Sequence, residues 1–303
     1  MAPIRTPYKM ELKQLLSGTG VALVTPMDAR GVVDYKALGR LIDHNITNGV
    51  NYLVVLGTTA ESVVLSQEEK HSIIDYVRKY VSGRVPLVLG HGGNNTAALV
   101  EGIGQLDVTG YTALLSVTPY YNRPSQKGLE AHYLALASAS PLPILLYNVP
   151  SRTGCNLENE TVWSLLRQSS KFIGIKEASA DFDKTLDLLA HRPADFLVIS
   201  GDDATAAEAV LAGAEGVISV IGQATTGLFT QMIQQAQQGD RPGVQVLMND
   251  LEKLIELIFV EGNPTGIKSL LSILGICGPH VRLPLVAASP GLEDQLKQAL
   301  SQG

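Results

Sequence analysis

Cysteine, basic charge and long apolar runs are all scarce in this chain of 303 residues. Its two cysteines, Cys155 and Cys277, cannot build a disulfide framework, and their spacing matches no metal-binding motif. The formal net charge is -6, and because acidic and basic residues are interspersed, no basic stripe could follow a nucleic-acid backbone. No apolar run reaches the roughly 20 residues that a membrane helix needs, and segment 1–16 is too charged for a signal peptide. We therefore expect a cytoplasmic protein that binds neither nucleic acid nor membrane.

What the chain does contain is a regular alternation of two patterns. Hydrophobic residues make up 45% of the sequence and charged residues 17%, which is typical of a protein with a packed core. Short apolar runs recur, and a segment with helical periodicity follows each of them, as in successive strand–helix units. These runs are Val21–Thr25, Tyr52–Leu56, Leu87–Leu89, Ala113–Val117, Ile144–Asn148, Ile173–Glu177, Leu197–Ser200 and Val217–Val220.

The runs are continuously apolar rather than alternating, as expected for parallel strands that are buried on both faces. Eight such units favour a closed (β/α)8 TIM barrel, and no GxGxxG follows the first run. An open doubly wound sheet remains the alternative. After the eighth run the pattern predicts only helices, and no linker precedes them. We predict one domain over 1–303, with the barrel at 18–225 and a C-terminal helical extension at 226–303 packed on it. The predicted helices of this extension are Gly227–Gln238, Gly243–Val260, Ile267–Leu274 and Leu292–Ser301.

Polar residues near the carboxyl ends of barrel strands are candidates for catalysis, because active sites of such barrels lie there. Lys176 ends an otherwise apolar run, and because desolvation lowers the pKa of an ammonium group, a buried lysine can act as a nucleophile toward a ketone. An ion pair with Glu177, or a side chain that extends to the barrel rim, would also explain this lysine.

Tyr147 lies at the end of the fifth run, on the same face as Leu145, and its phenol could relay protons beside the lysine. A tyrosine packed in the core, with its hydroxyl bonded to the backbone, would explain this position equally well. Gly57–Ser62 (GTTAES) follows the second run and is suited to hold a small carboxylate, although a helix cap would explain its threonines as well. Gly201–Asp203 could similarly be a simple turn.

These segments together resemble the dihydrodipicolinate synthase branch of the N-acetylneuraminate lyase superfamily, the class I pyruvate-dependent aldolases. The resemblance extends from about Gly20 to Pro284. It is carried by GTTAES (57–62), VTPYYNRPSQ (117–126), LYNVPSRTG (146–154), GIKEAS (174–179), SGDD (200–203) and GVISV (216–220).

By this resemblance Lys176 forms the imine, and Tyr147, Thr58 and Tyr121 form the proton relay. The tyrosine at the position of Tyr121 reaches into a neighbouring subunit in the family, which implies a tight dimer and a homotetramer built as a dimer of dimers. The remaining implied roles are binding of the pyruvate carboxylate by Thr59, pocket lining by Gly201 and Ile218, and binding of the second substrate's carboxylate by Arg152.

The implied reaction is the condensation of pyruvate with L-aspartate 4-semialdehyde in the biosynthesis of diaminopimelate and lysine. It requires no cofactor or metal. Two alternatives remain open: a sialic-acid or 2-keto-3-deoxy sugar-acid aldolase that uses the same lysine, and a barrel that has lost catalysis and serves as a binding protein. The presence of Arg152 and of the Thr58–Thr59 pair favours the synthase.

The sequence departs from the family pattern at two places. Ala60 occupies a position where glycine is commoner, which is tolerable if the backbone there does not need a positive φ. Lysine-inhibited members have an interface pocket with a glutamate at the position of Ala98 and a histidine at that of Lys70, beside residues that match Ser62, Asn94 and Tyr120. We therefore predict weak or absent inhibition by L-lysine.

The histidines show no metal-ligand spacing, and we assign no chemistry to them. His44, His71, His132 and His191 fall in predicted helices or at their ends, where we expect them at the surface. His91 follows the third run and lies nearest the expected site.

Overall fold

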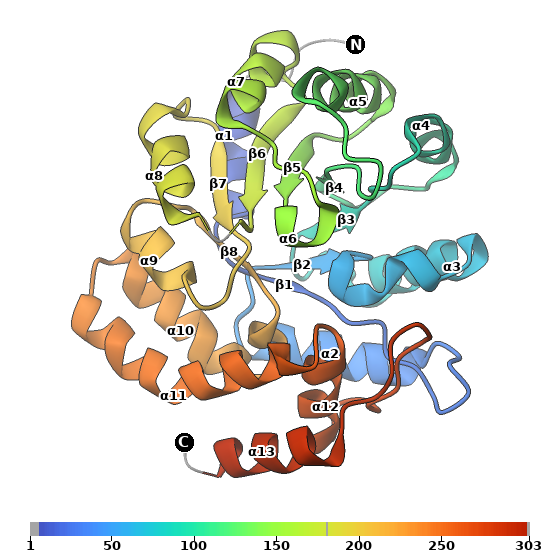
Figure 1. The fold of residues 1–303 in the computed structure, drawn as a ribbon, viewed down its shortest axis with the longest axis vertical. Helices are drawn as coiled ribbons and strands as arrows, with labels where there is room; N and C mark the ends of the chain where they lie inside the picture. The colour runs from blue at the N-terminus through green and yellow to red at the C-terminus, as the bar shows by residue number, and fades with distance from the viewer. Residues whose placement is uncertain (1–5, 180, 302–303) are drawn as a thin grey trace.

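The computed structural model describes residues 6–179 and 181–301 of the chain. Eight parallel strands form a closed barrel in which β8 pairs with β1 (Figure 1). The strands are β1 Gly18–Ala22, β2 Tyr52–Val55, β3 Leu87–Gly90, β4 Ala113–Val117, β5 Ile144–Asn148, β6 Phe172–Glu177, β7 Leu197–Ser200 and β8 Gly216–Ser219. The predicted TIM barrel is confirmed, and the closed ring excludes the open doubly wound sheet.

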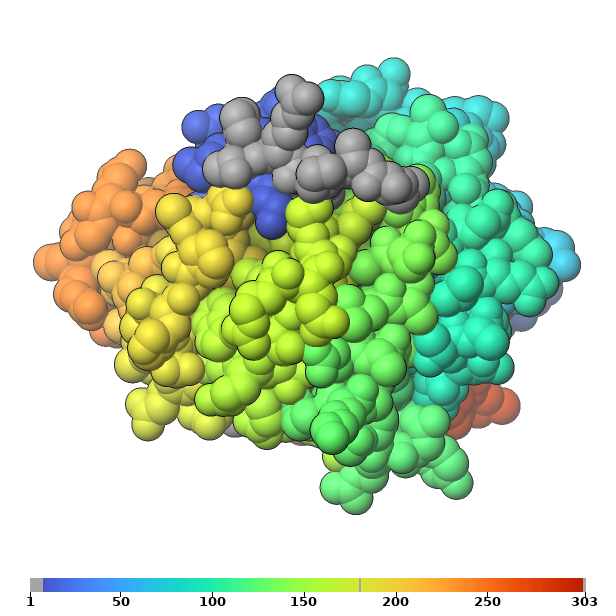
Figure 2. Space-filling model, turned by 90° about the horizontal axis from the view of Figure 1, so that it is seen from above, coloured from blue at the N-terminus to red at the C-terminus, as the bar shows by residue number. Residues whose placement is uncertain are grey.

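Helices alternate with the strands and surround the barrel (Figure 1). Before β8 these are α1 Thr6–Leu15, α2 Tyr35–Thr47, α3 Gln67–Val81, α4 Thr96–Gln105, α5 Gln126–Ala139, α6 Pro150–Thr153, α7 Asn159–Gln168, α8 Phe182–His191 and α9 Ala206–Leu211, with the 3-10 turns η1 Thr58–Ala60 and η2 Ser62–Val64. After β8 come the 3-10 turn η3 Ile221–Gln223 and the helices α10 Thr226–Gln237, α11 Arg241–Val260, α12 Thr265–Ile273 and α13 Pro290–Leu300. Figure 2 shows one side of the ring, where segments follow one another in chain order from orange through yellow to green.

Side-chain caps fix where several helices begin. The Ser66 hydroxyl accepts a hydrogen bond from the Glu69 N–H, and the Glu69 carboxylate accepts one from the Ser66 N–H, so that α3 begins with a capping box. Asp34 caps α2 and Asp181 caps α8 through the N–H three residues on. A cap of this kind stabilises a helix by about 1 kcal/mol. The caps hold each helix start at a fixed distance from the strand end before it, where the site lies.

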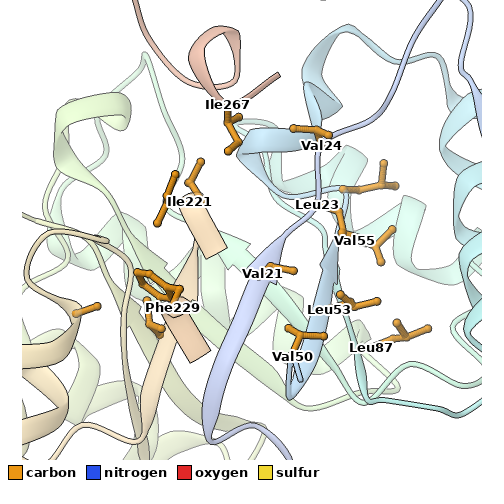
Figure 3. Packing of buried hydrophobic residues seen from close by; sticks show 14 of the residues in the cluster. Val21, Leu23, Val24, Val50, Leu53, Val55, Leu87, Ile221, Phe229 and Ile267 are labelled. Atoms are coloured by element: carbon orange, nitrogen blue, oxygen red, sulfur yellow. The ribbon is translucent and has the colours of Figure 1, made fainter. Parts of the chain in front are cut away.

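The apolar residues form two layers that the barrel wall separates. Inward side chains such as Val54, Leu145 and Ile218 make up the inner layer, together with Leu12 and Leu16. The larger outer layer lies between strands and helices. Figure 3 shows part of this outer layer, in which Val21 and Val55 of the sheet share a cluster with Phe229 of α10 and Ile267 of α12.

The first strand begins three residues earlier than predicted, at Gly18 rather than Val21. Its first residues carry little apolar signal because there is no room for large side chains. A Cβ at Gly20 would lie 2.3 Å from the Tyr52 ring, and Gly18 pairs with Gly216 in the neighbouring strand. The apolar run that predicted this strand continues past its end, through Leu23 and Val24 into the following loop.

Helix α1 was not predicted, and it closes the amino-terminal end of the barrel. The Lys9 ammonium donates to the carbonyl of Phe172, the first residue of β6, and the Lys13 ammonium donates to the Ala194 carbonyl and pairs with Glu215. Leu12 of α1, 1% exposed, enters the inner layer. The site is therefore left with one open end, at the carboxyl ends of the strands.

The four helices after β8 match their predicted positions to within two residues at each end. Helix α10 packs against β1 and α9, and α11 packs against α10, α12 and α13 (Figure 1). The division of the chain at residue 225 stays a prediction. In the described part of the chain, no helix has both the length and the apolar character needed to cross a membrane.

His132 corrects one expectation, because it is buried rather than at the surface, with 4% of its area exposed. Its Nδ1 lies 2.8 Å from the hydroxyl of Thr96, which begins α4, and its ring meets Tyr133 edge-on. The contact between α4 and α5 covers this face of α5, which the sequence of α5 alone does not reveal. Burial lowers the pKa of His132 to about 4.

Candidate active site

Lys176 lies on the inner face of β6 with 5% of its area exposed. An irregularity in β6 sets this orientation: Ile144 pairs with Phe172 but Leu145 pairs with Gly174, which leaves Ile173 as an extra residue. Beyond it, Lys176 pairs with Tyr147 across the strands. Its neighbour Glu177 does not hold it, because that carboxylate binds other groups. They are the Lys184 ammonium at 3.0 Å, the Asn148 amide and the Ser179 N–H.

Tyr147 faces the interior beside the lysine. The Lys176 Nζ lies 4.5 Å from the centre of the Tyr147 ring, and Tyr147 is 6% exposed. Leu145 belongs to the same inner layer, as predicted from alternation along β5. Among the described residues, neither the Lys176 ammonium nor the Tyr147 hydroxyl makes a hydrogen bond, so both are available to a bound molecule.

The Thr58–Thr59 turn connects β2 to α3 and lies between two residues in left-handed backbone conformation, Leu56 at φ 57° and Glu61 at φ 56°. The Thr25 hydroxyl donates to the Ala60 carbonyl at 2.8 Å and ties the turn to the loop that follows β1. Because the positive φ falls on Glu61, the methyl group of Ala60 fits here without backbone strain. Alanine is thus tolerated at this position, because the backbone of residue 60 does not need a positive φ.

Gly201 follows β7 and lies directly against the lysine side chain. A Cβ at this position would lie 2.8 Å from the Lys176 Cε and 2.6 Å from the Ala178 Cβ. The Gly201 N–H donates to the Glu177 carbonyl at 2.7 Å, which fixes the turn against β6. Glycine is needed here for close approach rather than for an unusual φ.

Arg152 lies at the cavity entrance in the short helix α6, which begins with Pro150 at the end of β5. The residue is exposed, and its guanidinium has no hydrogen bond or ion pair with the described residues. A loop contact supports the neighbouring backbone, since the Arg123 Nε donates to the Gly154 carbonyl at 2.7 Å. Arg152 is therefore a free, exposed cation at the mouth.

One cavity of about 370 Å³ unites most of the predicted site. The predicted residues that line it are Thr58, Thr59, Tyr147, Arg152, Lys176 and Gly201. Ile218 does not line it but lies fully buried in the inner layer. Tyr121 lies on the loop after β4, 89% exposed, and is absent from the cavity of its own chain.

The cavity also contains residues that the sequence analysis missed. Asn263, between α11 and α12, lines it and donates from its Nδ2 to the Thr59 Oγ1 at 3.0 Å. Phe259 at the end of α11 lines it as well, and so does Ser179. The signal for Asn263 was the Gly262–Asn263–Pro264 break between two apolar helices, where a buried polar residue needs a partner.

A second cavity of about 480 Å³ lies beside the first. It brings together the five residues that resemblance assigned to an effector pocket, Ser62, Lys70, Asn94, Ala98 and Tyr120. A smaller cavity shares Thr58 and Tyr147 with the first and Ser62 and Tyr120 with the second. Burial lowers the pKa of Lys70 in this wall.

Known proteins resemble this chain over nearly its whole length. The model of the dihydrodipicolinate synthetase family matches residues 15–303. The 4-hydroxy-tetrahydrodipicolinate synthase of Parabacteroides distasonis is 45% identical over 287 residues, which cover 95% of this chain and 97% of that protein. The same enzyme of Flavobacterium psychrophilum is 46% identical and covers 93% and 97%. The solved structure of the chloride-inhibited dihydrodipicolinate synthase of Acinetobacter baumannii, complexed with pyruvate, has a TM-score of 0.91 at 37% identity and covers 94% and 98%.

Proposed function

Because this chain belongs to the dihydrodipicolinate synthetase family, we propose that its cavity binds pyruvate as an imine on Lys176 and condenses it with L-aspartate 4-semialdehyde. The enzyme is a lyase of this family, and the product, 4-hydroxy-tetrahydrodipicolinate, leads to diaminopimelate and lysine. The relatives carry the name of the synthase, so the sugar-acid aldolase and the non-catalytic barrel are set aside.

The observation that carries the proposal is the Lys176 ammonium. It lies buried at the base of a cavity, against a tyrosine ring, and none of the described residues binds it. A structural lysine at such depth would need an anionic partner, and the adjacent carboxylate of Glu177 is taken by Lys184. An amine that is held without a partner beside a phenol suits nucleophilic attack on a ketone.

The chemistry follows from these positions. The Lys176 amine attacks C2 of pyruvate, and the Tyr147 hydroxyl supplies and removes protons while the carbinolamine loses water. Loss of a proton from C3 gives an enamine, whose carbon adds to the aldehyde. The amine of the second substrate then attacks C2, closes the ring and releases the lysine. Thr58 and Tyr121 extend the proton relay in this proposal.

The two substrates each carry a carboxylate, which needs a cation or hydrogen-bond donors in the cavity. We assign the pyruvate carboxylate to the Thr58–Thr59 turn, where the Thr59 hydroxyl accepts from Asn263 and keeps its own proton to donate. The carboxylate of the semialdehyde goes to the free guanidinium of Arg152, whose planar fork matches it. Gly201 leaves room for the imine beside the lysine.

The test measures turnover with pyruvate and L-aspartate 4-semialdehyde, coupled to a reductase that consumes NADPH. The wild-type protein turns over, Lys176→Ala does not, and borohydride with pyruvate adds mass at Lys176. Unchanged turnover in Lys176→Ala would refute the proposal. Labelling of Lys176 without turnover would retain the imine but favour the alternative of a sugar-acid aldolase.

We also propose that the chain assembles as a homotetramer of tight dimers, in which Tyr121 completes the partner's site. Support comes from its exposure of 89% on a loop held at φ 74° and from its absence from its own cavity. Mixing Tyr121→Phe with Lys176→Ala subunits tests this. Hybrid dimers regain turnover if Tyr121 crosses the interface, because one site then has both Lys176 and the partner's tyrosine. A mixture that is as inactive as its two components contradicts this role of Tyr121.

We propose the cytoplasm as its location. Cys155 and Cys277 are both free thiols in the structure, as is usual in a reducing compartment. Fractionation of the native host, followed by detection of the protein, tests this proposal. Recovery outside the cytoplasm would overturn it.

A further inference from the structure

The Thr58–Thr59 turn lies in a strained stretch of backbone. Leu56 and Glu61 on either side have left-handed φ values, which residues with a Cβ adopt only when neighbouring groups hold them there. The turn lines the cavity, and Thr59 is 2% exposed. Contacts outside the turn must therefore keep it in this shape.

The strongest of these contacts comes from the C-terminal helices. Glu61, which directly follows the 3-10 turn η1, is 3% exposed, and its Oε1 accepts from the Lys268 Nζ at 2.5 Å. Lys268 belongs to α12 and is fully buried. The two residues are 207 positions apart in the sequence, so the pair joins the carboxylate-binding turn to the helical extension.

Both partners are also tied to the segment after α12. The Lys268 Nζ donates to the His280 carbonyl at 2.7 Å, and the Glu61 Oε2 accepts from the Arg282 N–H at 2.8 Å. The guanidinium of Arg282 continues the network to the carbonyls of Gly31 and Val64. Each polar atom of the buried pair thus has a partner, and the turn is fixed from outside the cavity.

We infer that Lys268 and Glu61 are positioning residues for pyruvate, which hold the Thr58–Thr59 turn in its carboxylate-binding shape from the C-terminal extension. Neither touches the reacting atoms. Lys268 does not line the cavity, and the Glu61 carboxylate is occupied by Lys268 and Arg282. The inference rests on the role proposed for Thr58–Thr59.

The experiment measures the pyruvate concentration that half-saturates borohydride trapping at Lys176, which reports imine formation without the second substrate. Lys268→Met raises this concentration about ten-fold or more, because a displaced turn loses hydrogen bonds to a carboxylate. A matched control is Lys13→Met, which breaks the Lys13–Glu215 ion pair at the other end of the barrel. It leaves pyruvate half-saturation unchanged.

A second variant separates positioning from stability. Lys268→Met alone leaves the Glu61 carboxylate buried and unpaired, whereas Glu61→Gln combined with Lys268→Met contains no unpaired charge. The double variant melts at a higher temperature than Lys268→Met but keeps the raised pyruvate requirement. If the double variant reaches half-saturation at the wild-type pyruvate concentration, the inference is overturned. This result can be obtained even if Lys268→Met alone does not fold.

Thr59→Ala distinguishes this inference from the function on which it rests. If Thr59→Ala leaves pyruvate half-saturation unchanged, the proposed carboxylate role of the turn is wrong. If Thr59→Ala raises it while Lys268→Met and the double variant do not, the carboxylate role stands and only the positioning role of Lys268 and Glu61 is refuted.

Discussion

Gly201→Ala should slow imine formation without replacing any group that reacts. The added methyl group would lie 2.8 Å from the Lys176 Cε and 2.6 Å from the Ala178 Cβ. It would also lie 3.1 Å from the Glu177 carbonyl oxygen, so all three of its close neighbours belong to β6 or to the residue after it. The turn cannot retreat easily, because the Gly201 N–H binds that same carbonyl at 2.7 Å. Of the three neighbours only the Lys176 side chain is flexible, so it moves aside, while the contacts with Ala178 and the Glu177 carbonyl strain the turn itself.

The size of the effect follows from these distances. Carbon atoms in contact lie about 3.5–4.0 Å apart, so the Lys176 Cε must shift by about 1 Å. A misplacement of about 1 Å can slow a reaction about 100-fold, and we expect that loss in the rate of imine formation. Overpacking costs about 1–3 kcal/mol of stability, which should leave the barrel folded.

Borohydride trapping with pyruvate, followed by mass spectrometry over time, gives this rate directly. Gly104→Ala is the matched control, because the same methyl group there meets no atom within 4 Å and lies in the exposed part of α4. It should trap pyruvate at the wild-type rate. Trapping in Gly201→Ala within about three-fold of wild type would refute the steric reasoning.

Three further predictions follow. Burial holds the pKa of His132 at about 4, below its ordinary value near 6.5. The unfolded chain therefore binds more protons between these values, and stability is lost as pH falls from about 6.5 to 4. Urea unfolding across this range should show a flatter pH dependence in His132→Asn, and an unchanged slope would contradict it. L-lysine at submillimolar concentration should leave turnover unaffected, since Ala98 offers no carboxylate and Lys70 adds a like charge; half-inhibition there would disprove this. Arg152→Ala should raise the KM for the semialdehyde by about ten-fold or more while pyruvate trapping stays unchanged; equal KM values would remove Arg152 from substrate binding.

The strands were predictable because a buried parallel strand must be apolar throughout. Runs such as Ala113–Val117 and Ile144–Asn148 match the strands residue for residue. The largest errors fall at β1, where packing demands small side chains at the beginning, with Gly20 under the Tyr52 ring, and where the apolar run continues past the end of the strand. Helix α1 was missed for a related reason, since it presents only a narrow apolar face, including Leu12, to the barrel end.

The site was predictable where its residues lie at strand ends, because a barrel brings those ends together whatever the connecting helices do. Lys176, Tyr147 and Gly201 meet this condition. Ile218 also lies on a strand, but it is fully buried in the inner layer and does not line the cavity. Tyr121 lies on the loop after β4, where it is 89% exposed, and the barrel of its own chain does not bring it to the cavity.

Asn263 does not lie at a strand end, because it follows a helix. The spacing of apolar residues in α11 and α12 predicts only that each helix buries an apolar face. Such spacing predicts that a helix face is buried, but it does not identify the segment that packs on it. A buried asparagine carries more information, because its amide needs partners that an apolar helix cannot supply. Here the partner is the Thr59 hydroxyl, 204 residues away, so the helical extension forms a wall of the site as well as an outer layer of the barrel.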